Sequence, residues 1–214
     1  MPSPEQEAAE PAAPTTGRAA RGPYRAGRAR RREILQASTE VFAQDGYRGG
    51  SLRDIAGAIG VSPGAILHHF GSKEQLLVAV LEDRDLYSRD TVMSFMDSGR
   101  VIDGIRHIVI DNERSPGLMR LYTTLAAEAV NTEHPAHRYF VDRYAMLASF
   151  IIETLAREGH EAPPGQTFED TASLILSTID GLQLQWLLSP TFSMIGRFDA
   201  MLAAHGLLDL SGRA

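Results

Sequence analysis

Side chains that could hold a polyanion gather between residues 51 and 73. This stretch carries two cations, Arg53 and Lys73, and the adjacent histidines His68 and His69. Arginine can donate two parallel hydrogen bonds to a phosphate or to the edge of a guanine, and serine hydroxyls can bind phosphate oxygens. Neighbouring helical residues diverge by about 100°, so the two histidines are predicted to approach phosphates rather than to chelate one ion together.

Two short helices are predicted to position these side chains. Ser51 precedes the first helix, and Asp54 stands three residues later, which is the spacing of a capping box. Apolar residues recur at helical spacing within it: Leu52, Ile55, Ala56 and Ile59. One side of this helix is therefore apolar and is expected to face a core.

A tight turn and a second helix follow. Gly60 can end the first helix with a positive φ, Ser62 can cap the second, and Pro63 suits its first position, where a missing N–H costs nothing. Ile66 and Phe70 stand one turn apart and are expected to pack inward. The outer surface then carries Ala65, His68 and His69.

Two short helices joined by a glycine-containing turn are typical of the helix-turn-helix, whose second helix lies in the major groove of DNA. An ordinary helical hairpin in a hydrophobic core has the same spacing. The spacing alone therefore leaves both interpretations open.

The wider sequence favours the first interpretation. The chain resembles the TetR family (TetR/AcrR type) of one-component bacterial regulators in five strings: R-x-x-I-L-x-A at 31–37, V-F-A-x-x-G-Y at 41–47, S-L-R-D-I-A at 51–56, G-V-S-x-G at 60–64 and H-F-x-S-K-E-x-L-L at 69–77. The match keeps one register from about residue 28 to residue 81. Leu67 departs from it, because the family usually has an aromatic residue there, most often Tyr, which would contact a phosphate.

The resemblance implies which residues contact DNA: Ser51, Arg53, Ser62, Pro63, Gly64, Ala65, Leu67, His68, His69 and Lys73. The first turn of the second helix has no side-chain donor, so it can offer a base only apolar contacts, such as Ala65 against a thymine methyl. For Arg53 two roles stay open, reading a guanine or pairing with a phosphate or a nearby acid. The resemblance places Lys73 at a phosphate.

The charge distribution supports contact with DNA by the N-terminal part alone. A net charge of −6 over 214 residues argues at first against nucleic acid, because DNA binding depends largely on cations. From residue 17 to residue 80, however, ten Arg or Lys stand against five acidic residues, whereas from residue 81 onward eleven Arg stand against nineteen acids. A basic N-terminal module is thus joined to an acidic C-terminal one.

Residues 1–27 are predicted to form a disordered basic arm. Residues 1–16 are rich in Pro, Ala and Glu without periodicity, and residues 17–32 contain seven Arg and no acid. Two interpretations stay open, a solvated tail or an arm that follows the phosphate backbone or enters a minor groove.

The rest of the chain predicts longer helices and no strands. They are expected at about 72–96, 101–113, 116–131, 135–158, 168–188 and 192–207, after a first helix at about 28–44. The fold class is therefore all-α, with about nine helices. A helix-turn-helix domain over 28–80 precedes a C-terminal ligand-binding and dimerisation domain over 81–210, and the helix from residue 72 would act as a lever between them.

The predicted helix over 168–188 is apolar in nearly every direction, so it must be buried on more than one side. It could be a central core helix, or it could pack one face on its own domain and one on a partner. The resemblance favours the second interpretation, since TetR regulators dimerise through a four-helix bundle of their last two helices. The interface residues predicted on this basis are Ile175, Ile179, Leu182, Phe198, Met201 and Leu202.

Six residues on or beside apolar stripes could line a ligand pocket: Asn112, Met119, Tyr122, Tyr144, Gln183 and Trp186. For each one alone, a core position with a satisfied polar tip is the alternative. As a group they match an apolar cavity with a few convergent polar groups. The resemblance implies that a small-molecule effector binds inside this domain.

Other sites and compartments find little support. His134 and His137 could share a metal ion, but no third ligand has a fixed spacing, which favours a helix-capping and surface role. No apolar run approaches the roughly 20 residues of a membrane span, and no secretory signal is visible, so we expect a cytoplasmic protein without a membrane partner. The absence of Cys excludes disulfides and thiol catalysis.

Together these features predict a homodimeric transcriptional regulator, expected to be a repressor, that binds a palindromic double-stranded operator and releases it when an effector binds. A DNA-binding architectural or developmental regulator without a ligand is the first alternative. A helical enzyme is the second, but no G-x-G-x-x-G, P-loop, G-x-S-x-G or H-E-x-x-H string occurs. No enzyme activity and no cofactor are expected.

Overall fold

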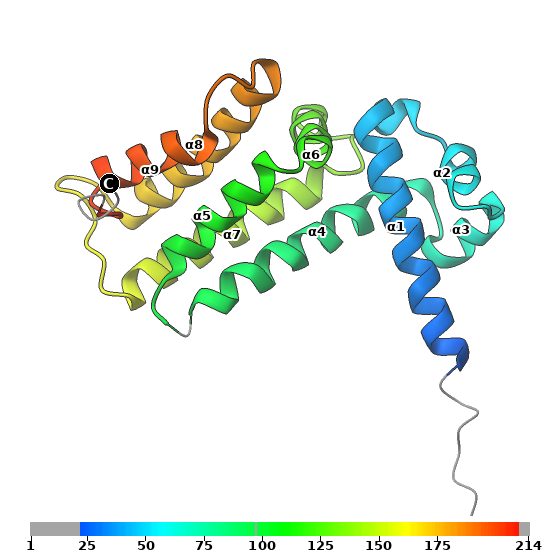
Figure 1. Ribbon diagram of the computed structural model, residues 1–214, viewed down its shortest axis with the longest axis horizontal. Coiled ribbons are helices and arrows are strands. Elements are labelled where there is room, and N and C mark those ends of the chain that lie inside the picture. The colour runs from blue at the N-terminus through cyan, green and yellow to red at the C-terminus, as the bar shows by residue number, and fades with distance from the viewer. Residues whose placement is uncertain (1–21, 97, 210–214) are drawn as a thin grey trace, which may run out of the picture.

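The computed structural model describes residues 22–96 and 98–209 and is all-α, as predicted (Figure 1). Helices α1, α2 and α3 lie together at one end, α8 and α9 lie at the other, and α4 runs between the two parts. Nine helices occur within the described residues: α1 (Gly22–Gly49), α2 (Leu52–Ala58), α3 (Pro63–Phe70), α4 (Lys73–Met96), α5 (Val101–Glu113), α6 (Pro116–Glu128), α7 (His137–Arg157), α8 (Phe168–Leu188) and α9 (Met194–Ala204).

Helix α1 begins earlier than expected. It starts at Gly22, so residues 22–27, which the sequence assigned to a disordered arm, are helical. Pro23 stands in the first turn, where its missing N–H costs no hydrogen bond, so it is compatible with the earlier start. Residues 1–21, the remainder of the predicted arm, lie outside the described residues. Near the other end, Gly46 adopts φ 71° and interrupts the regular helix where the sequence predicted its end.

The two short helices form by the local interactions that their sequence predicts. Ser51 accepts a hydrogen bond from the Asp54 N–H, and the Asp54 carboxylate accepts one from the Ser51 N–H, which completes the capping box. Gly60 has φ 66°, a conformation that favours glycine, and it turns the chain into α3. Ser62 then accepts from the Ala65 N–H at 3.2 Å.

Later helices lie close to the predicted positions, with two differences. Helix α9 covers Met194–Ala204, shorter than the predicted 192–207, and the connection between α6 and α7 is longer than predicted. Helix α6 stops at Glu128 and α7 starts only at His137. In the connection, the Asn131 side-chain oxygen accepts the Glu133 N–H at 3.1 Å. An asparagine that bonds the backbone two residues on favours a turn over a helix, so the connection is longer than predicted.

Two apolar clusters hold the helices together. The first takes Ile34 and Phe42 from α1 and Ile66 from α3, and it continues without a break to Leu125 of α6 and Phe140 of α7. The second joins the far part of α4 to α5, α7, α8 and α9. The helix-turn-helix unit therefore shares its core with the C-terminal domain.

The described helices were also compared with the length and apolarity that a bilayer crossing requires. None of them meets both requirements.

The shared core predicts a common unfolding transition. Replacing Leu125, which is fully buried, with alanine should lower the free energy of unfolding by about 2–5 kcal/mol, because the cavity left behind loses packing contacts on both sides. Chemical denaturation followed by circular dichroism would measure it. Val130→Ala, at a residue 82% exposed just beyond α6, should change it by less than about 0.5 kcal/mol. Separate transitions for the N-terminal helices and the remainder would contradict the shared core.

Candidate functional site

The outer side of α2 and α3 is available for contact. Ile66 and Phe70 are buried and fix α3 on the core, as predicted. Ala65 and His69 are partly buried at its edge. Of the residues predicted to contact DNA, six are exposed: Arg53, Ser62, Pro63, Gly64, Leu67 and His68. A short helix held by its inner face and exposed along its outer face has the geometry of a groove-binding helix.

The capping serines Ser51 and Ser62 differ in whether their hydroxyl proton is free to bind another group. The Ser51 hydroxyl donates to the Asp54 carboxylate, so its proton is used within the cap. Hydrogen bonds from the Ser51 side chain and backbone hold the pKa of Asp54 below its usual value, which keeps the acceptor charged. Ser62 accepts from the Ala65 N–H and is exposed, so its own proton can point outward.

Lys73 faces into the domain, which differs from the predicted phosphate contact. Its Nζ donates to the Tyr47 carbonyl oxygen at 2.5 Å and lies 4.5 Å from the centroid of the Tyr47 ring. A carbonyl oxygen and an aromatic face both attract an ammonium group, and together they draw the side chain inward. In this arrangement Lys73 ties the first turn of α4 to the end of α1.

Tyr47 links the helix-turn-helix unit to the C-terminal domain. Its hydroxyl donates to Glu74 at 2.9 Å, and its ring meets the His134 ring edge-on at 5.5 Å between centroids. Burial, followed by the hydrogen bond and the charge of Glu74, raises the pKa of Tyr47 to about 12. His134 accepts from the Ala136 N–H at 3.2 Å, the capping role that the sequence favoured, but it lies buried rather than at the surface.

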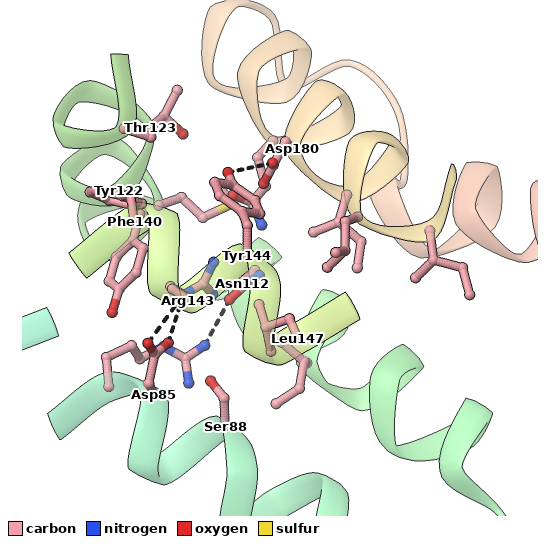
Figure 2. Close-up of a pocket in the computed structure, with 18 of the residues that line it drawn as sticks. Asp85, Ser88, Asn112, Tyr122, Thr123, Phe140, Arg143, Tyr144, Leu147 and Asp180 are labelled. Carbon is pink, nitrogen blue, oxygen red and sulfur yellow. Dashed lines mark hydrogen bonds and ion pairs between the residues drawn. The ribbon is translucent and has the colours of Figure 1, made fainter. Parts of the chain in front are cut away.

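A cavity of about 570 Å³ lies in the C-terminal domain, with walls from α4, α5, α6, α7 and α8 (Figure 2). This volume is within the range of about 300–1,000 Å³ that is common for small-molecule sites. Much of its wall is apolar: Val92, Ile105, Ile108, Met119, Leu147, Phe150 and Ile179. Polar residues of α4 border it as well: Arg84, Asp85, Ser88 and Arg89.

An ion pair with most of its side-chain surface removed from solvent, 20% exposed for Arg143 and 17% for Asp85, joins α4 to α7 at this cavity. Arg143 Nε donates to Asp85 at 2.9 Å (Figure 2). The Tyr139 hydroxyl donates to the same carboxylate. Burial lowers the pKa of Arg143, but the charge of Asp85 and its hydrogen bond outweigh that effect and raise the pKa overall. Beside this pair, the Tyr122 hydroxyl donates to the Leu81 carbonyl oxygen at 2.6 Å. Burial is the main cause that raises the pKa of Tyr122 and of Tyr139.

Two further polar contacts cross the cavity wall. Arg84 Nη2 donates to the Asn112 side-chain oxygen at 2.7 Å, which joins α4 to α5. The Tyr144 hydroxyl donates to Asp180 at 2.6 Å, which joins α7 to α8 (Figure 2). Burial, assisted by Asp180, raises the pKa of Tyr144, so it stays a neutral donor. The arrangement can bind a small molecule, with polar ties from α4 and α7 within reach of it.

Comparisons with known proteins agree with this geometry. Residues 34–80 match the model for bacterial regulatory proteins of the tetR family, and residues 100–205 match that for the C-terminal part of BetI-type transcriptional repressors. The chain belongs to the TetR family. The first match contains the helix-turn-helix of this TetR-family chain, and the second contains most of the cavity wall.

Curated relatives are repressors and regulators of the same kind. The transcriptional repressor AcnR of Corynebacterium efficiens is 36% identical over 128 residues, which cover 59% of this chain and 64% of that repressor. The transcriptional regulator BetI of Escherichia coli is 27% identical over 168 residues, which cover 75% of this chain and 83% of BetI. The match to AcnR therefore spans less than two thirds of that repressor's length.

Among solved structures, a transcriptional regulator from Saccharomonospora viridis in complex with choline is similar, with a TM-score of 0.63 and 22% identity. The match covers 82% of this chain and 96% of that one. At this identity the likeness concerns the fold.

Five of the six predicted ligand residues line the cavity: Asn112, Met119, Tyr122, Tyr144 and Gln183. Trp186 does not, because the wall contributed by α8 ends at Leu184 and Trp186 packs against the second apolar cluster. The prediction omitted the charged residues Arg84, Asp85 and Arg143. Their helices do carry apolar stripes, but a lone charge beside a stripe is usually solvated, and only the packing of α4 on α5 and α7 turns these charges inward.

The predicted dimer interface needs correction. Four of its residues are buried within the subunit: Ile175, Leu182, Phe198 and Leu202. They belong to the second apolar cluster, in which α8 packs against α7 and α9, so they are not available to a partner. Ile179 and Met201 are partly buried against the same cluster. The exposed sides of the two helices carry other residues: Ser173, Ser177, Leu184 and Leu188 on α8, and Gly196, Ala200 and Ala204 on α9.

The ion pair at the cavity predicts a large difference between two Asp→Asn substitutions. Asp85→Asn would leave the Arg143 guanidinium buried without its counter-charge and should lower the free energy of unfolding by about 3–5 kcal/mol. Asp142→Asn breaks the Arg138–Asp142 pair, whose side chains are 82% and 57% exposed, and should cost about 0–1 kcal/mol. Urea denaturation of both variants makes the comparison. Equal losses would show that the cavity pair is not desolvated.

Proposed function

We propose that this TetR-family chain is a homodimeric transcriptional repressor that binds an inverted-repeat operator and releases it when a small molecule occupies the cavity. The observation that carries the proposal is the course of α4. Its first turns place Leu76 and Leu77 in the core below α3, and the same helix then borders the cavity with Arg84 and Asp85. Helix α4 thus connects α3, the helix proposed to enter the major groove, to the ligand site.

The direction of control follows from linkage. A ligand can shift the balance between two arrangements only by its differential affinity for them, and typical coupling is about 1–3 kcal/mol. A ligand that competes for the α4 contacts at the cavity would favour an arrangement of α4 that misplaces α3. The DNA-free arrangement should therefore bind the effector better.

The nature of the relatives supports an effector-responsive repressor in the cytoplasm. AcnR is a repressor by name, and the solved neighbour from Saccharomonospora viridis holds a small molecule, choline. A cavity of about 570 Å³ gives this chain room for a small-molecule ligand as well.

Selection from random duplex DNA tests the operator. The purified protein should enrich an inverted repeat, because each protomer contributes one α3 and the half-sites must match the spacing of the two helices. Enrichment of single half-sites, or of no sequence, would contradict a dimeric operator-binding protein.

Arg53 is the side chain that we expect to discriminate bases. It is exposed at the start of α2, and the first turn of α3 lacks a side-chain donor. Arg53→Ala should therefore weaken binding to the selected operator by about 1–3 kcal/mol and relax preference at one base pair in each half-site. Fluorescence anisotropy with operator variants measures both effects.

Arg138→Ala removes the same charge from an exposed position on α7, and it should leave base preference unchanged. If Arg53→Ala weakens every operator variant by the same factor, Arg53 holds a phosphate instead. Specificity would then depend on methyl contacts and DNA shape.

The dimer should form through the exposed sides of α8 and α9. Leu188 is 78% exposed at the end of α8, and small residues on α9 would let two backbones approach closely. Leu188→Glu places a charge in this contact and should shift the protein to monomer in sedimentation velocity, with loss of tight operator binding. Leu86→Glu, at a residue 50% exposed on α4, should leave the dimer intact. A Leu188→Glu dimer would exclude this interface.

A further inference from the structure

We infer that the effector of this protein is an anionic amphiphile, an apolar body that carries a carboxylate or a similar anion, and that Arg84 is its anchor. The inference rests on the proposed function, because it names the ligand class of the same cavity. It follows from the state of each charged and aromatic group in the cavity wall, taken in turn.

Arg84 is a partly buried cation that forms no ion pair among the described residues. Its guanidinium carbon lies 5.1 Å from the centroid of the Tyr87 ring. Its Nη2 donates to the neutral Asn112 amide oxygen at 2.7 Å, and its Nη1 is buried without a hydrogen-bond partner among the described residues. Burial lowers the pKa of Arg84 and outweighs the raising influence of nearby groups, including Asp111 and Asp85. A buried guanidinium N–H group without an acceptor is costly, and an anion within reach of Nη1 would relieve that cost.

The other charges at the cavity are already satisfied. Arg143 is paired with Asp85 at 2.9 Å. Asp180 accepts from the Tyr144 hydroxyl at 2.6 Å. Arg89 is 64% exposed, so water solvates it. Arg84 is therefore the charge in this wall that a ligand can best complement.

A cationic ligand is disfavoured because Arg143 already lies against the tyrosine rings of the cavity wall. Quaternary ammonium groups are recognised by the faces of aromatic rings, and the electron-rich tyrosine rings in this wall are Tyr122 and Tyr144, beside Phe140 and Phe150. The guanidinium carbon of Arg143 lies 5.3 Å from the Tyr122 centroid and 5.9 Å from the Tyr144 centroid. The protein's own cation thus lies against both tyrosine rings, and its positive charge would repel a ligand cation in the same cavity.

The remainder of the cavity selects for an apolar body. Beyond the polar residues of α4 the wall is formed by side chains such as Ile105, Met119 and Phe150. A ligand carboxylate that accepted from both Nη1 and Nη2 of Arg84 would compete with the Asn112 oxygen for Nη2. Loss of the Arg84–Asn112 hydrogen bond would free α4 from α5 at this point. Ligand binding would in this way change the position of α4.

Three probes with the same ten-carbon chain test the charge preference. Decanoate, decanol and decyltrimethylammonium are titrated into the purified protein below their aggregation concentrations, and binding is measured by calorimetry at pH 7.5. Decanoate should bind about tenfold or more tightly than decanol, since a hydrogen-bonded charge exceeds the contribution of a neutral partner. Decyltrimethylammonium should bind more weakly than decanol.

Arg84→Gln keeps a donor for Asn112 and removes the charge, so it should abolish the preference for decanoate over decanol while both still bind. Arg138→Gln removes an exposed charge on α7 and should leave the preference unchanged. A melting curve confirms that each variant is folded.

Equal binding of decanoate and decanol, tightest binding of the cationic probe, or a preference that survives Arg84→Gln would each overturn the inference. Absence of binding by all three probes would also overturn it. Operator binding by the ligand-free protein is measured in parallel, and its absence would contradict the proposed function itself. Loss of the charge preference with operator binding intact would contradict only the ligand class.

Discussion

Burial of one continuous apolar cluster is the constraint on which the rest of the structure depends. Ile34 and Phe42 of α1, Leu77 of α4 and Leu125 of α6 pack into the same core. Helices α2 and α3 therefore share their hydrophobic core with the C-terminal domain and cannot pack independently of it. Close-packed interiors change between discrete arrangements rather than deform continuously. A shift in α4 or α6 must therefore also move the surface on which α3 packs.

A second constraint is electrostatic and acts on the same helix. Neighbouring residues of α4 reach different helices, since side chains diverge by about 100° per residue. Asp85 binds Arg143 of α7, whereas Arg84 binds Asn112 of α5. Charges withdrawn from water need partners, so these ties hold α4 in one position as long as no ligand competes for them. The cavity thus lies where these polar ties join α4 to α5 and α7.

Local interactions explain most of what the sequence determined. The Ser51–Asp54 capping box, the positive φ of Gly60 and the Ser62 cap involve residues at most a few positions apart, so the spacing of residue types was sufficient to predict them. Helical periodicity predicted the inward packing of Ile66 and Phe70 by the same reasoning. The strings that resemble the TetR family run through these local features, and for that reason the family could be recognised before the fold.

Contacts between residues distant in the chain were decided only by the tertiary structure. Lys73 turns inward because Tyr47, at the end of another helix, offers it a carbonyl oxygen and a ring. Phe198 lies in the subunit core rather than at a dimer interface. An apolar stripe on a helix does not determine which neighbouring element covers it. The contact of Arg84 with Asn112 follows likewise from the packing of α4 on α5. The sequence determined which surfaces are apolar or charged, and the packing of helices determined what each surface meets.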